Sequence, residues 1–139
     1  MSDFKAQESR IARILGGGKT PGVSWKTLKT YRDHLRQNLE LPCRLTGVED
    51  FPWEERYVFG FGSKAEYEKL KQTKPSYRDT FELLSFNKIY VGSGILVRVR
   101  RVSDKKEFEL PLADLKARDK RSKNYELLDD YSVWFVNYQ

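Results

Sequence analysis

The sequence has a single cysteine, Cys43, and a single histidine, His34, among its 139 residues. One cysteine excludes an intrachain disulfide framework and a cysteine-based zinc site, so we expect a reducing compartment. No apolar run approaches the length of a membrane span, and the N-terminal residues lack the apolar core of a signal peptide. These absences predict a cytoplasmic protein that has no membrane partner.

Recognisable catalytic motifs are also missing. His34 falls in a predicted helix, and Cys43 falls at the start of an apolar strand, where a buried structural cysteine is the usual role. The run GGGKT at 16–20 does not complete a phosphate-binding loop, because Arg13 stands where that loop needs a glycine and Pro21 follows. We therefore expect a protein without enzymatic activity.

The sequence is rich in charged and aromatic residues. Charged residues make up 33% and aromatic residues 14% of the sequence, and the formal net charge is +6. Most of the positive excess lies in the first forty residues, whereas residues 41–90 are balanced. The three glycines at 16–18 predict a flexible N-terminal arm over 1–22, followed by a single domain over 23–139.

Three helices are expected from apolar periodicity and capping residues. The first covers 4–15, and the second covers about 25–38 with Ser24 as its N-cap. A third, short helix at 64–72 follows a capping box that begins at Ser63.

The strands expected from alternation and turn residues are short. A single helical turn is expected at 113–118. Together these features predict an α+β fold with a small, bent antiparallel sheet that forms an SH3-like partial barrel, with an N-terminal helix and one short inserted helix. The expected strands cover 41–48, 56–60, 80–90, 95–102, 107–112 and 132–137.

Carboxylates gather in the stretch 41–60, where two aromatic residues lie among four acids. A second acidic pair precedes the last predicted strand. Carboxylate oxygens favour hard cations such as calcium, and the shortage of histidine and cysteine argues against softer metals. The alternative is that these acids simply pair with the many lysines and arginines. The candidate calcium ligands are Glu49, Asp50, Glu54, Glu55, Asp129 and Asp130.

The basic residues indicate an alternative function. They alternate along the strand 95–102 and recur in the polar loop 116–124, and the helix 25–38 also has a basic face. Such a surface suits an SH3-like interaction module that binds nucleic acid or an acidic protein. Interleaved acids leave a third interpretation, an ordinary solvated surface. The candidate contacts are Arg98, Arg100, Arg101, Lys116, Arg118, Lys120 and Arg121.

Four segments resemble the calcium-binding CcbP-type family: EDFPWEE (49–55), PSYRDTFELL (75–84), FELPLADL (108–115) and LLDDYSVWF (127–135). The resemblance covers about residues 41–137. It implies a small α+β protein that binds calcium through surface carboxylates outside any EF-hand, as a buffer or sensor. It also implies that the candidate ligands named above hold the ion. We expect a monomer or a weak homodimer.

Overall fold

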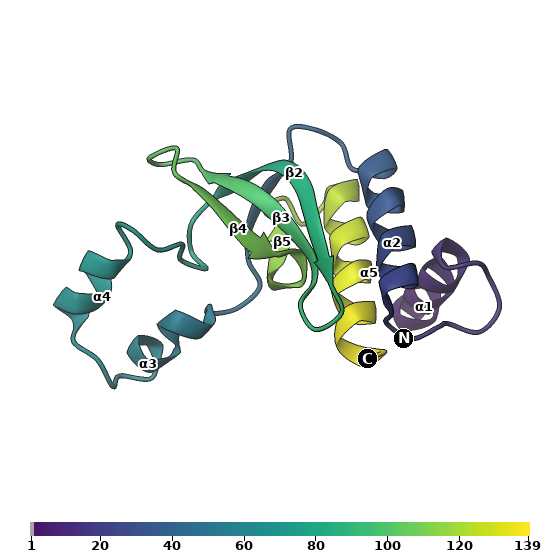
Figure 1. The fold of residues 1–139 in the computed structure, drawn as a ribbon, viewed down its shortest axis with the longest axis horizontal. Coiled ribbons are helices and arrows are strands. Elements are labelled where there is room, and N and C mark those ends of the chain that lie inside the picture. Colours follow the sequence, from purple (N-terminus) through teal and green to yellow (C-terminus); the bar gives the residue numbers. More distant parts are fainter. Residues whose placement is uncertain (1) are drawn as a thin grey trace.

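A five-stranded antiparallel sheet lies at the centre of the computed structural model, which describes residues 2–139 (Figure 1). The strand order in space is β4-β3-β2-β1-β5. The predicted α+β class and antiparallel sheet are thereby confirmed. The sheet is open, with β4 and β5 at its edges, so the SH3-like partial barrel is not confirmed. The strands are β1 (Arg44–Gly47), β2 (Phe81–Tyr90), β3 (Gly94–Arg101), β4 (Glu107–Pro111) and β5 (Leu115–Ala117).

Three helices pack together beside the sheet: α1 (Ser2–Ile14), α2 (Trp25–Asn38) and α5 (Lys123–Asn137) (Figure 1). Helix α2 contacts β2 and β3, α5 contacts β5, and α1 contacts both helices. Aromatic rings fill the layer between helices. Tyr31 stacks on Trp134 with ring centroids 5.1 Å apart, and both side chains are fully buried. This aromatic packing joins α2 to α5.

The C-terminal segment 132–137 is helical, so the strand predicted there is wrong. Ser122 caps α5 by accepting a hydrogen bond from the Tyr125 amide at 3.1 Å. The aromatic and β-branched residues of the segment favoured a strand locally, but their spacing places the apolar ones on one helical face. That face is buried through Leu127, Leu128, Tyr131, Trp134 and Phe135.

Residues 48–80 form a lobe that projects from the sheet between β1 and β2 (Figure 1). It contains η1 (Pro52–Glu54), α3 (Glu55–Val58) and α4 (Lys64–Leu70). The helix predicted at 64–72 is confirmed, and Ser63 caps it by accepting from the Glu66 amide at 3.0 Å.

The strand predicted at 56–60 is wrong, because this segment holds α3 and a turn. Val58 and Phe59 are exposed rather than aligned against a strand. The helical turn predicted at 113–118 lies slightly earlier, as η2 (Leu112–Asp114). Residues 115–117 pair with β1 as β5 instead.

Part of the segment predicted as an arm, 1–22, is α1. Its Ile11 is buried in the core, and its Arg10 contacts Asp130 of α5. Gly16, Gly17 and Gly18 all have positive φ angles, which explains why the chain turns after α1. The mobility of this segment stays a prediction.

Candidate functional site

The segments that carry Glu49 and Asp114 run side by side where β1 ends and β5 begins. Gly47 lies opposite Leu115 in the ladder, and the Val48 amide donates to the Asp114 carbonyl at 2.9 Å. This pairing brings Glu49 near Asp114. Burial raises the pKa of the half-buried Asp114 carboxyl, and the nearby negative charge of Glu49 raises it further. No Lys or Arg nitrogen lies within 4.0 Å of either carboxylate in the described part of the chain.

Two more of the predicted ligands, Asp50 and Glu55, lie on the same segment as Glu49. Glu55 is exposed and Asp50 is half-buried. Neither forms an ion pair within residues 2–139. The segment 49–55 therefore carries three uncompensated carboxylates in a chain whose net charge is +6.

Glu54, in contrast, is an internal structural group. It is fully buried. Its Oε1 accepts from the amides of Phe51 and Tyr77 at 3.2 and 2.8 Å. Its Oε2 accepts from the hydroxyls of Tyr67 and Ser76 at 2.6 and 2.7 Å. Since four donors occupy its two oxygens, Glu54 joins η1 to α4 and to the chain that leads into β2.

The C-terminal acidic pair lies in the contact between α1 and α5. Asp130 is buried and accepts from Arg10 Nε and Nη2 at 2.8 and 2.9 Å and from Gln7 at 3.0 Å. Asp129 is exposed and accepts from Gln7 at 2.9 Å. Among the side chains that the structure describes, no three of His, Cys, Asp or Glu are grouped so as to hold a metal ion. The structure therefore does not gather the six predicted ligands into one site.

Sequence reasoning did not select Asp114, which lies alone between apolar residues. Only the pairing of β1 with β5 brings it beside Glu49, some sixty-five positions earlier in the chain. Its one sequence signal was its place shortly after the predicted strand 107–112, in a connecting segment where polar side chains often serve a site.

The predicted basic strand face is largely neutralised. Arg98 Nε lies 2.7 Å from Glu107, and an Arg100 Nη atom lies 2.9 Å from Glu82. These cross-strand pairs place an acid next to each base on the outer face of the sheet. The face therefore offers little net positive charge to a polyanion.

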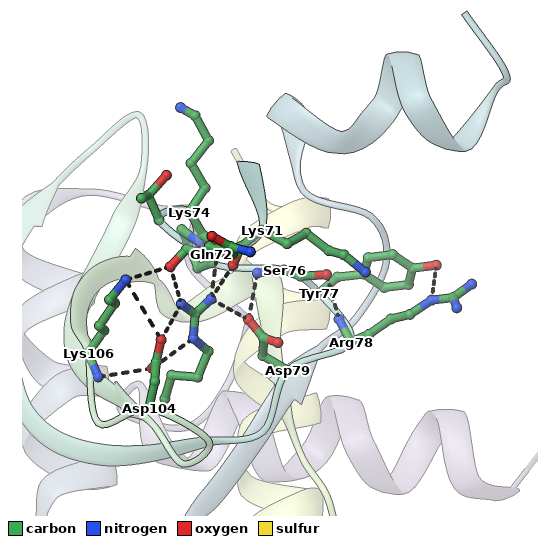
Figure 2. A network of polar contacts seen from close by, with 12 residues as sticks. Lys71, Gln72, Lys74, Ser76, Tyr77, Arg78, Asp79, Asp104 and Lys106 are labelled. Carbon is green, nitrogen blue, oxygen red and sulfur yellow. Dashed lines mark hydrogen bonds and ion pairs between the residues drawn. The ribbon is translucent and has the colours of Figure 1, made fainter. Parts of the chain in front are cut away.

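Arg101, the third predicted contact on this strand, is buried and anchors the lobe (Figure 2). It donates to the carbonyls of Lys71, Gln72 and Lys74, each at 2.9 Å. It also pairs with Asp79 at 3.0 Å and with Asp104 at 2.7 Å. A phosphate cannot reach a guanidinium that is enclosed in this way.

The other four residues predicted to contact nucleic acid or an acidic protein lie on or beside β5. Lys116 is half-buried, and Arg118, Lys120 and Arg121 are exposed. None of the four has a carboxylate within 4.0 Å in the described residues. Of the predicted basic set, these are the members whose charge remains available to a partner.

Cys43 and His34 share no hydrogen bond in the described part of the chain, and burial shifts the pKa of each. Burial raises the pKa of the Cys43 thiol to about 11, so the thiol is protonated at neutral pH. Burial also lowers the pKa of His34, and Lys123 lowers it further. The Nδ1 atom of His34 lies 3.3 Å from the Asn38 amide nitrogen within the same helix.

Taken together, the elements define an α+β protein with an open antiparallel sheet, a layer of three helices and a projecting lobe. This fold is similar to that of CcbP from Anabaena, whose crystal structure superposes with a TM-score of 0.55. The alignment covers 95% of this chain and 89% of that chain, at 14% sequence identity. At this identity the likeness shows a shared fold. No family model and no curated protein matches the sequence.

Among the described residues, no helix combines the length and the apolar character that a membrane crossing requires.

Proposed function

We propose that this chain is a non-catalytic calcium-binding protein, a buffer or sensor, whose site is centred on Glu49 and Asp114. The observation that carries the proposal is that the charge of Glu49 acts on the half-buried Asp114, while neither carboxylate has a Lys or Arg nitrogen within 4.0 Å among the described residues. Two uncompensated negative charges, one of them half-buried, repel each other, and a divalent cation relieves that repulsion. The CcbP-like fold and the family resemblance of segment 49–55 support the same function.

The donor chemistry suits calcium, which takes six to eight oxygen ligands in a flexible geometry. Glu49 and Asp114 supply two carboxylates, and Asp50 and Glu55 lie on the same segment. Backbone carbonyls and water complete such a site in many proteins. Glu54 and Asp130 do not belong to the proposed site, because internal donors already occupy their oxygens.

A calcium titration of the full chain, followed by two-dimensional amide NMR and calorimetry, tests the proposal. We expect saturable shifts at residues 48–55 and 112–115, with magnesium binding more weakly because it demands a stricter octahedral geometry. The double variant Glu49→Gln, Asp114→Asn should lower the calcium affinity by at least about tenfold, because both carboxylates are lost.

The matched control removes two negative charges from residues outside the proposed site. Asp33 and Glu40 form no ion pair in the described chain, so Asp33→Asn with Glu40→Gln should leave the calcium affinity nearly unchanged. An equal loss in both double variants would mean that only net charge matters, and the site assignment would fail. The absence of any shift at millimolar calcium would overturn the function itself.

A further inference from the structure

The turn between α3 and α4 exposes two phenylalanine rings at the tip of the lobe. Phe59 is 68% exposed and Phe61 is 78% exposed. The Phe61 amide donates to the Arg56 carbonyl at 2.7 Å, and Gly60 has a φ of +85°, so the turn has a defined shape. Adjacent exposed aromatics on a soluble surface indicate a contact site more often than scattered single residues do.

The aromatic residues beneath the tip hold it in place. Tyr57 stacks on Tyr67 with centroids 5.2 Å apart and ring planes within 12°. The Trp53 indole donates to the Pro75 carbonyl at 2.6 Å. Hydrogen bonds of the buried Glu54 and Arg101 connect the lobe that holds this small aromatic core to the chain next to β2 and to β3. The two phenylalanines are therefore presented on a preformed support, which lowers the entropic cost of binding.

Two basic residues flank the tip in the sequence, Arg56 before it and Lys64 after it. Residues 56–78 contain six basic side chains and two acidic ones. Both acids are engaged, since Glu66 accepts from the Tyr57 hydroxyl at 2.5 Å and Glu68 pairs with Lys71 at 3.2 Å. Five of the basic side chains have no carboxylate within 4.0 Å in the described chain, namely Arg56, Lys64, Lys69, Lys74 and Arg78.

We propose that the tip of the lobe binds single-stranded nucleic acid, with nucleobases stacked on Phe59 and Phe61 and phosphates beside Arg56 and Lys64. Proteins that bind single strands combine exposed aromatic rings with basic side chains that are free to contact phosphates. An apolar protein helix needs a groove to bury its anchors. Rings that are more than two-thirds exposed do not line a groove, whereas a nucleobase needs only one open ring face.

The test measures fluorescence anisotropy of labelled oligouridylate and oligothymidylate as the full chain is added at several salt concentrations. We expect saturable binding that weakens steeply as salt rises. The variant Phe59→Ala, Phe61→Ala should lose at least about tenfold in affinity, because stacking carries a large share of single-strand binding. Arg56→Gln with Lys64→Gln should reduce the salt dependence, because fewer phosphates are neutralised.

Phe4 provides the matched control for the aromatic residues. It is 64% exposed on α1, so Phe4→Ala removes a similarly exposed ring from another surface. It should leave the affinity unchanged, and all variants should keep the unfolding curve of the native chain. The proposal is overturned if neither oligonucleotide binds or if the Phe59, Phe61 variant binds as tightly as the native chain. Ring-dependent binding to phosphatidylserine vesicles without oligonucleotide binding would also overturn it.

Discussion

The guanidinium of Arg101 forms a two-point contact with the carboxylate of Asp104, three residues later in the chain. Nε donates to Oδ1 at 3.0 Å, and Nη2 donates to Oδ2 at 2.7 Å (Figure 2). This contact fixes the plane of the guanidinium and points its remaining donors at the carbonyls after α4. The turn between β3 and β4 thus positions the group that anchors the lobe.

Replacing Arg101 should therefore loosen the lobe and destabilise the protein. Arg101→Met leaves three carbonyls and two carboxylates without their donor, and we expect a loss of about 3–5 kcal/mol in the free energy of unfolding. Arg100→Met is the matched control, because Arg100 forms one partly exposed pair and should cost about 0–1 kcal/mol. Urea denaturation measures both. A similar loss in the two variants would contradict the anchoring role of Arg101.

The same contact predicts a loss of stability in acid. The hydrogen bonds from Arg101 hold the pKa of Asp104 at about 2, below its ordinary value. A lowered folded-state pKa means that the contribution of Asp104 is complete above the ordinary carboxyl pKa, and it falls as the pH drops toward about 2. Thermal unfolding followed between those limits should show a shallower decline in Asp104→Asn than in the native chain. Parallel declines would show that other carboxylates account for the acid sensitivity.

Glu54→Gln tests the structural role of the buried carboxylate. The amide that replaces one oxygen faces donors instead of accepting from them, so we expect a loss of about 1–3 kcal/mol in unfolding free energy. Glu55→Gln changes the neighbouring exposed carboxylate and should shift stability by less than about 0.5 kcal/mol. Trp53 lies in the same small aromatic core, so its fluorescence should follow the Glu54 change. An unchanged unfolding midpoint in Glu54→Gln would mean that the four hydrogen bonds contribute little.

The contact between Arg10 and Asp130 should control how firmly α1 is held. Arg10→Met leaves Asp130 buried without its cation, and we expect a loss of about 1–3 kcal/mol. Amide hydrogen exchange in residues 2–14 should accelerate more than exchange in the sheet. Arg13→Met removes an exposed arginine from the same helix and should have little effect on either measurement. Unchanged exchange in α1 of Arg10→Met would show that apolar contacts such as those of Ile11 suffice to hold the helix.

Local signals in the sequence sufficed for most of the elements. Ser24 and Ser63 mark the starts of α2 and α4 because each hydroxyl accepts from an amide in the first turn. The alternation of valine and arginine in 95–102 marks β3, since one of its faces is buried. The C-terminal segment was misassigned because its β-branched and aromatic residues suit either structure, and packing against Tyr31 selects the helix.

For the candidate site too, some features follow from the sequence and others only from the tertiary structure. Most of the elements, the excess of positive charge and the acidic segment 49–55 follow from the sequence alone, because these depend on local spacing and composition. The tertiary structure decided which charges are free. Glu54, Asp130 and Arg101 are buried among partners from distant parts of the chain, while the pairing of β1 with β5 brings Asp114 to Glu49. Such partnerships depend on contacts between residues far apart in the sequence, which local spacing and composition do not specify.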